Sequence, residues 1–294
     1  MILVNPKAGR GYGVRVARGL QKAGFASGGL EVVSGARVLA AKLQELRGRE
    51  ERIFVAGGDG TARLAVQVLA GSETALGVIP AGTGNDFARS LGVRRGSLRD
   101  LERLLFAGVR KRVDVGSAGG RVFCSVCGWG FAGLVAAAAQ AVPFVRGTLP
   151  FFFGILRQLP AWGRDNVRVT VPGYGVQGRY AAVLVQNTPY TGGGMKLAPA
   201  AGLRDGKLDL LLVEPVPRAK LLRHLPSVMV GRHLLQPFFQ YFQVERVLVE
   251  TEQKVVTTLD GDIFTESPRE AHVVADALWV VVPGDGNDTG LSKG

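Results

Sequence analysis

A run of glycines around one aspartate and one threonine, Gly57-Gly58-Asp59-Gly60-Thr61, is the segment best suited to chemistry. It lies between an apolar run typical of a buried strand and a segment that fits the start of a helix. Glycine lets the backbone turn sharply and approach a ligand closely, and the first N–H groups of a helix favour phosphate. Asp59 could orient a magnesium ion, because Mg²⁺ favours one or two carboxylates together with waters and phosphate oxygens. The plainer alternative is a tight turn with Asp59 or Thr61 as the N-cap.

Two more glycine-containing segments follow predicted strands: residues 5–11 (NPKAGRG) and residues 80–89 (PAGTGNDFAR). In a parallel sheet with right-handed crossovers, such loops lie along one edge, which is where ligands bind. The three loops together therefore predict a nucleotide pocket. The sequence has neither the GxxxxGK[ST] loop of Walker-type NTPases nor the HRD and DFG signatures of protein kinases.

The order of the predicted elements gives the fold class. Strands are expected at 2–4, 30–33, 53–56 and 76–80, with helices at 14–23, 36–47 and from 61. This alternation predicts an α/β domain with a parallel sheet. Later runs predict strands at 121–126, 166–171, 180–186, 207–213 and 244–249, and helices at 134–141, 149–159 and 218–230. These short strands indicate a second domain that is rich in antiparallel β-structure.

We therefore expect three parts. Residues 1–116 form a nucleotide-binding α/β domain. Residues 117–283 form a β-rich lipid-substrate domain, whose last strand could pack back on the first domain. Residues 284–294 form a loose tail.

The second half contains two acidic turns. Residues 187–200 (NTPYTGGGMKLAPA) lead to Asp205-Gly206-Lys207, and Leu259 precedes Asp260-Gly261-Asp262. Taken alone, each could be an ordinary turn. In this order and spacing, however, the three glycine loops and these two turns resemble the diacylglycerol kinase family, which includes sphingosine, ceramide and bacterial lipid kinases. The resemblance covers residues 1 to about 283.

The resemblance implies an ATP-dependent lipid kinase that uses Mg²⁺, with a first domain like that of NAD kinase and phosphofructokinase. The acidic residues Asp59, Asp86 and Asp114 match positions that organise magnesium and water near the phosphates. Asp205, with the carbonyls of Gly202 and Lys207, matches a metal site of the second domain. The positions that match ATP contacts are Asn5, Pro6, Lys7, Ala8, Gly9, Ser34, Gly57, Gly58, Asp59, Gly60, Thr61, Ala62, Arg63, Leu64, Thr83 and Asn85.

Asp262 matches the general base of the family. Phosphoryl transfer needs the acceptor hydroxyl in line with the γ-phosphate, and a carboxylate that can take its proton. The sequence departs from the family pattern at two places. The family often has Glu where Asp262 stands, and it has Asn-Glu where this chain has Arg63-Leu64 after Ala62. Arg63 could instead meet phosphate as a cation.

The net charge of +12 favours a polyanionic partner. The sequence has no helix-turn-helix signal and no zinc-finger spacing, so an anionic membrane is a better candidate than nucleic acid. An arginine-rich face with no dedicated partner stays open, as does a homodimer. The apolar region 142–162 is broken by prolines, glycines and arginines, so it cannot span a membrane. Its phenylalanines, residues 151–153, could line an acyl groove, touch a membrane surface or simply pack in a core.

Cys124 and Cys127 form a lone CxxC without a second metal-ligand pair, which indicates structural thiols in a reducing cytoplasm. The opening residues have no basic lead-in of a signal peptide. We therefore expect a cytoplasmic enzyme that is peripherally associated with the membrane. Two rivals remain. One is an NAD or sugar kinase of the same superfamily, and the other is a catalytically weak protein that binds nucleotide and lipid.

Overall fold

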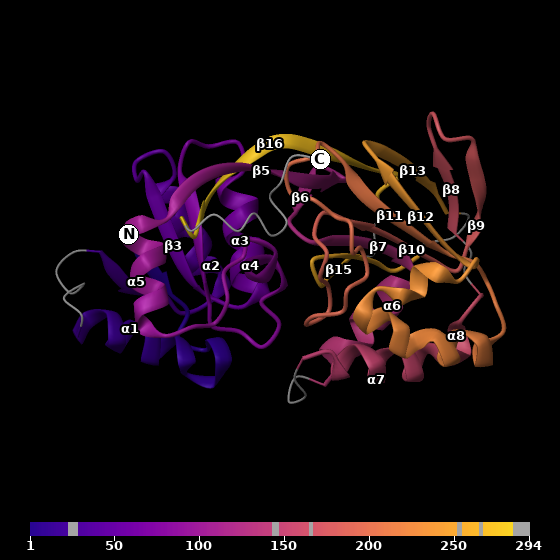
Figure 1. Cartoon of the computed structure of the whole chain (residues 1–294), viewed down its shortest axis with the longest axis horizontal. Helices are drawn as coiled ribbons and strands as arrows, with labels where there is room; N and C mark the ends of the chain where they lie inside the picture. The colour runs from indigo at the N-terminus through magenta and orange to yellow at the C-terminus, as the bar shows by residue number, and fades with distance from the viewer. Residues whose placement is uncertain (23–28, 143–146, 165–166, 252–254, 265–266, 285–294) are drawn as a thin grey trace.

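The structure is a computed structural model that describes residues 1–22, 29–142, 147–164, 167–251, 255–264 and 267–284. The predicted tail therefore lies outside the described residues, except for Gly284. The first domain and the second domain lie side by side in Figure 1, and strands at the top of that view run between them.

The first domain is built on four parallel strands in the order β2 (Leu30–Val32), β1 (Ile2–Val4), β3 (Arg52–Gly57) and β4 (Ala75–Pro80). Every residue of β1 and β4 is buried, as expected for strands covered on both faces. The helices α2 (Ala36–Leu46) and α3 (Asp59–Leu69) pack against each other, while α1 (Tyr12–Lys22) contacts α5 (Leu98–Ala107). The parallel sheet predicted from the sequence is confirmed.

The same sheet continues into the second domain. The long strand β16 (Glu270–Val282) pairs in parallel with β4 and antiparallel with β5 (Val109–Ala118) and β13 (Arg246–Glu250). Beyond β13 lie β8 (Val167–Val171) and β9 (Val176–Tyr180), and β6 (Arg121–Phe123) pairs with β5. β5 and β16 therefore join the two domains through backbone hydrogen bonds (Figure 1).

A second sheet has the order β12 (Phe239–Val244), β11 (Leu208–Val213), β10 (Ala182–Gln186), β7 (Val126–Gly130), β14 (Thr257–Leu259) and β15 (Asp262–Phe264). It packs face to face on the extension of the first sheet, because one buried apolar cluster combines residues of β8 and β13 with residues of β7, β10 and β11. The result is the antiparallel β-rich domain that the sequence predicts.

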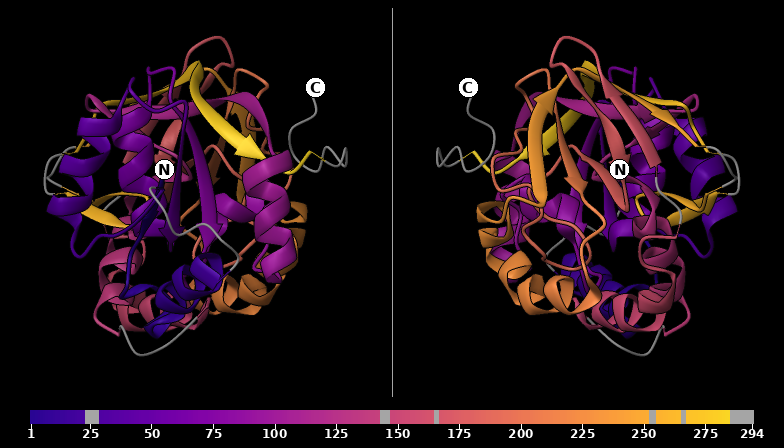
Figure 2. Two further views of the ribbon diagram at one scale, coloured as in Figure 1. Left: turned by 90° about the vertical axis from the view of Figure 1, so that its left-hand side faces the viewer. Right: turned by 90° about the vertical axis from the view of Figure 1, so that its right-hand side faces the viewer.

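Helices cover the other face of the second sheet. They are α6 (Phe131–Gln140), α7 (Leu149–Gln158) and α8 (Arg218–His224), with 3₁₀ turns at Leu159–Ala161, Leu225–Val230 and Arg232–Leu235. Figure 2 shows these helices gathered on one side of the molecule, below the strands. They share an apolar cluster with β10 and β11. Among the described residues, no helix is both long and apolar enough to cross a membrane.

Three predicted strands are each two strands in the structure. Residues 121–126 comprise β6 and the start of β7, residues 180–186 contain the end of β9 and all of β10, and residues 244–249 join β12 to β13. In each case the chain crosses from one sheet to the other within one or two residues. The apolar pattern continues across the crossing, because both sides face the same core.

Candidate active site

The three glycine loops of the first domain converge at the carboxyl edge of its parallel strands. The side-chain amide of Asn5 donates to the Thr61 hydroxyl at 3.1 Å, which joins the first loop to the start of α3. Gly9 lies so close to the loop after β4 that a Cβ on it would come within 2.2 Å of the Ala81 carbonyl oxygen. Gly58 similarly lies against Gly82. The loops can approach each other this closely because glycine, which has no side chain, stands at the points of contact.

Asp59, the first residue of α3, holds the loop after β4. Its two carboxylate oxygens accept hydrogen bonds from the backbone N–H groups of Asn85, at 2.8 Å, and Asp86, at 2.6 Å. Asn85 adopts left-handed backbone angles (φ 58°), and its side chain closes the turn with Gly82. The GGDGT and GTGND segments therefore form one unit.

Asp86 lies directly beside Asp59 and is only 5% exposed. Its carboxylate accepts a hydrogen bond from the backbone N–H of Gly193 at 2.7 Å, across from the second domain, and pairs with Arg89 at 2.5 Å. Burial, reinforced by the negative charge of Asp59, raises the pKa of Asp86 to about 6, although Gly193 and Arg89 act in the opposite direction. Two carboxylates are thus held close together at the boundary between the domains.

The turn between β14 and β15 brings two more carboxylates to this boundary. Asp260 has φ 47° and accepts hydrogen bonds from three successive backbone N–H groups, those of residues 124, 125 and 126, at 2.7 to 2.9 Å. Asp262 instead forms an ion pair with Arg63 of α3. Arg63 and Asp262, two of the three residues at which the sequence departs from the family pattern, are therefore partners across the domain boundary.

The remaining predicted metal-binding residues lie in a separate group. Asp114 is 2% exposed, and its carboxylate accepts hydrogen bonds from the backbone N–H groups of Gly206 and Asp276, both at 2.8 Å. Asp205 accepts one from the backbone N–H of Lys207 at 3.0 Å, and a Cβ on Gly202 would come within 2.8 Å of the Asp205 carboxylate. Burial and, to a lesser degree, Asp114 raise the pKa of Asp205. Within the described part of the chain, no cluster of three or more His, Cys, Asp or Glu side chains is arranged for a metal.

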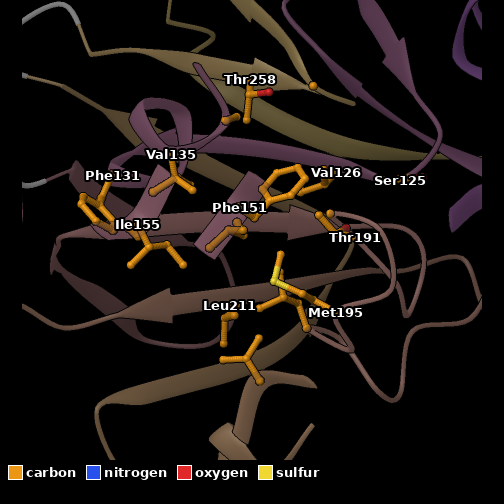
Figure 3. A pocket seen from close by; sticks show the side chains of 18 of the residues that line it. Ser125, Val126, Phe131, Val135, Phe151, Ile155, Thr191, Met195, Leu211 and Thr258 are labelled. Carbon is orange, nitrogen blue, oxygen red and sulfur yellow. The ribbon is translucent and has the colours of Figure 1, made fainter. Parts of the chain in front are cut away.

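An apolar cavity of about 230 Å³ extends from the carboxylates into the second domain. Asp59, Asp86 and Asp260 line it at one end. Its body lies between the second sheet and the helices α6 and α7, and Figure 3 shows the side chains that surround it. The apolar lining includes Val126, Phe131, Val135, Phe151, Ile155, Met195 and Leu211. One end of the cavity is thus acidic and the rest is hydrophobic.

Comparison with known proteins shows which family has this combination of an α/β domain and a β-rich domain. A family model described as diacylglycerol kinase catalytic domain matches residues 1–118, and one described as YegS C-terminal NAD kinase beta sandwich-like domain matches residues 125–282. A Bacillus subtilis protein named diacylglycerol kinase is 31% identical, with 96% of this chain and 95% of the relative aligned. The chain belongs to the diacylglycerol kinase family. It is therefore a member of a family of lipid kinases.

One further relative agrees with this family assignment, and a solved structure has the same fold. A Mycobacterium tuberculosis protein named diacylglycerol kinase is 29% identical, with 97% of this chain and 95% of that protein aligned. A crystal structure of a diacylglycerol kinase from Bacillus anthracis superposes with a TM-score of 0.71 at 21% identity, covering 96% of this chain and 95% of that one, which supports the fold.

In this diacylglycerol kinase family member, the predicted nucleotide residues lie along one sheet edge. Residues 5–9, 57–64, 83 and 85 belong to the three converging loops or to the start of α3, and Ser34 follows β2 at the same edge. The predicted metal residues fall into two groups, with Asp86 beside Asp59 and with Asp114 beside the turn at Asp205. Asp260, Arg89 and Gly193 were not among the residues predicted from the sequence to form the site. The Asp-Gly pair at residues 260–261, which is typical of a turn, could have drawn attention to Asp260. The contact between Gly193 and Asp86 arises only from tertiary folding, so the sequence gives no sign of it.

Proposed function

We propose that this chain transfers the γ-phosphate of ATP to the hydroxyl of a lipid such as diacylglycerol. One observation carries the proposal: the cavity that begins at Asp59 and Asp86, beside the phosphate-type loops, continues as a hydrophobic chamber. A lipid alcohol has the matching asymmetry, because its hydroxyl can face the nucleotide while its acyl chains occupy the apolar body. A sugar or a dinucleotide would leave its hydroxyl groups against an apolar lining, which is unfavourable.

In the proposed reaction, Asp262 accepts the proton of the lipid hydroxyl as that oxygen forms a bond to the γ-phosphorus. The bond between the γ-phosphorus and the bridging oxygen breaks, and ADP leaves. Arg63 holds the Asp262 carboxylate at the domain boundary through their ion pair. The N–H groups at the start of α3 face the nucleotide edge and suit phosphate oxygens. The loops at residues 5–9, with Ser34 and Thr83, would complete the ATP site.

The residues at the boundary also fit magnesium. Asp59 and Asp86 crowd two carboxylates together, and burial and Asp59 raise the pKa of Asp86, an effect that a divalent cation would reverse. These two residues would hold the ion, and Asp205 with the carbonyls of Gly202 and Lys207 would hold another. When bound, magnesium would neutralise charge on the phosphate oxygens.

We also propose that the helix α7 contacts an anionic membrane. Its inner face contributes Phe151 and Ile155 to the cavity, while Leu149, Phe153 and Leu156 point outward. Leu149 is 62% exposed and Leu156 is 57% exposed, which is unusual for large apolar side chains that stand together on one helix face. Together with the net charge of +12, this supports docking of α7 on the membrane beside the apolar cavity. The domain division at residue 116 is part of the same proposal, with ATP bound by residues 1–116 and lipid by residues 117–283.

The decisive test is incubation with γ-labelled ATP and Mg²⁺ against a panel of diacylglycerol, a sphingoid base, a polyprenol, phosphatidylglycerol, NAD and sugars. Label in the organic phase, identified by mass spectrometry, supports the proposal. Label in a soluble product would favour the NAD or sugar kinase. ATP binding without any transfer would favour the catalytically weak binding protein.

A further inference from the structure

A second cavity, of about 520 Å³, lies between the segment that contains α4 (Asp86–Ser90) and the loop at residues 189–201. It shares no lining residue with the apolar cavity. Four cationic side chains line it, and no carboxylate does: Arg89, Arg94, Arg95 and Lys196. This cavity therefore has the opposite character from the lipid chamber, being polar and positively charged.

The positive charge of this cavity is largely unbalanced. Arg94, Arg95 and Lys196 form no ion pair with a carboxylate within the described residues. Arg95 instead stacks on the ring of Tyr12 at 3.5 Å. Arg89 lies 5.2 Å from the ring of Tyr190, another lining residue. These aromatic contacts fix the planes of the guanidinium groups, which reduces the entropy lost when an anion binds.

We infer that this cavity is a binding site for a phosphomonoester, separate from the nucleotide and lipid sites. Arginine forks recognise phosphate through paired N–H donors, and a lysine adds a compact charge. Of the positions proposed to contact ATP, only Asn85 lines the cavity, and the residues from 5–9, 34, 57–64 and 83 do not. The phosphomonoester could come from a free metabolite or from the headgroup of a phosphorylated lipid.

Arg89 connects this site to the catalytic boundary. Its guanidinium donates to the Asp86 carboxylate at 2.5 Å and to the Gly84 carbonyl oxygen at 2.9 Å, while it also lines the cationic cavity. A phosphate in the cavity competes with Asp86 for the same cation. Occupancy therefore weakens the Arg89–Asp86 pair and slows phosphoryl transfer. This kinetic consequence rests on the proposed function, whereas binding itself does not.

The test measures binding by calorimetry in saturating ATP, using inorganic phosphate and glycerol 3-phosphate, and by sedimentation with phosphatidylcholine vesicles that contain or lack phosphatidic acid. The variants are Arg94→Gln and Lys196→Gln. Arg49→Gln is the control, because it removes an exposed positive charge at the opposite edge of the parallel sheet. Each cavity variant should weaken phosphomonoester binding about tenfold, equivalent to about 1.4 kcal/mol, and the control should not change it.

Binding of the soluble phosphates would identify a metabolite as the source, and binding only to phosphatidic acid vesicles would identify a lipid headgroup. The inference is overturned if neither binds, if saturating ATP abolishes binding, or if Arg94→Gln and Lys196→Gln behave like the control. A protein that binds phosphate in this way but transfers no label from ATP would refute the proposed function and leave the site intact.

Discussion

The ion pair between Arg63 and Asp262 gives the sharpest test of the active-site geometry, because the two residues come from different domains. The perturbation is a double-mutant cycle with Arg63→Asn, Asp262→Asn and the combination. Asp262 is proposed to accept the substrate proton, and Arg63 is proposed to hold it in place. The cycle separates these roles, since one acts in the chemical step and the other acts only through its partner.

The expected magnitudes follow from the exposure of the two side chains. Arg63 is 17% exposed and its Nε has no hydrogen-bond partner among the described residues, so removing Asp262 leaves a largely buried cation without its carboxylate. Asp262 is 46% exposed, so water can solvate it when Arg63 is removed, and solvent also screens the pair. We therefore expect Asp262→Asn to cost about 1–2 kcal/mol of stability and Arg63→Asn less than about 1 kcal/mol.

The expected effects on kcat have the same order, with Asp262→Asn more damaging than Arg63→Asn. Asp262→Asn should lower kcat by about 10²- to 10⁴-fold, the usual contribution of a general base, with ATP affinity unchanged. Arg63→Asn should lower kcat by about tenfold, and the double variant should be no slower than Asp262→Asn alone. Thermal unfolding and initial rates with a lipid acceptor measure both effects, and Glu250→Gln, at an exposed glutamate, is the matched control. Full turnover by Asp262→Asn would exclude Asp262 as the base, and strictly additive effects on kcat would show that Arg63 does not act through Asp262.

Three other predictions concern the buried carboxylates and the cavity. Because the pKa of Asp86 is raised to about 6 before a cation binds, Mg²⁺ binding measured by calorimetry should weaken as the pH is lowered through 6, and Arg89→Gln should move this midpoint upward. The same shift means that Asp86 favours folding most below its unfolded pKa of 3.8, and that this contribution is lost as the pH rises through about 6. Burial also raises the pKa of Asp209 to about 6, and its Oδ2 has no partner among the described residues, so Asp209→Asn should raise the unfolding temperature above pH 6 but not below pH 4. Ala136→Phe, which fills part of the apolar cavity, should reduce kcat/KM for lipid about tenfold or more while the KM for ATP stays constant in initial-rate assays.

The convergence of the three glycine loops could be predicted from the sequence because the pattern of each loop is local. Each consists of glycines and polar residues directly after an apolar run, and parallel strands place such loops at one edge. In the structure, the hydrogen bonds of Asp59 with the backbone of Asn85 and Asp86 join two of these loops at that edge. In contrast, the partners of Asp86 in the second domain, above all Gly193, depend on how the domains meet. That information is not present in the spacing of residues along the chain.

The strands that cross between the sheets show the same limit. Each of the three predicted runs at 121–126, 180–186 and 244–249 keeps its apolar pattern across the crossing, since the core lies between both sheets. Periodicity reports which residues face the core, and it does not report which sheet they belong to. β5 was missed for a related reason. After Val109 its first half consists of Arg110, Lys111 and Arg112, none of which is buried, so this half lacks the apolar pattern of the buried half.

The crossing at residues 124–126 also explains how the second domain presents Asp262, the proposed general base. The Asp260 carboxylate accepts hydrogen bonds from all three backbone N–H groups of this segment, which runs from the end of β6 to the first residue of β7. Asp260 can do so because its left-handed backbone turns the chain there, and that turn sets the direction in which Asp262 leaves. The two carboxylates therefore have different roles. Asp260 binds the backbone where the chain crosses between the two sheets, and the resulting turn places Asp262 opposite Arg63. The position of the proposed base is therefore a consequence of the sheet crossing and of α3 together, and neither domain alone determines it.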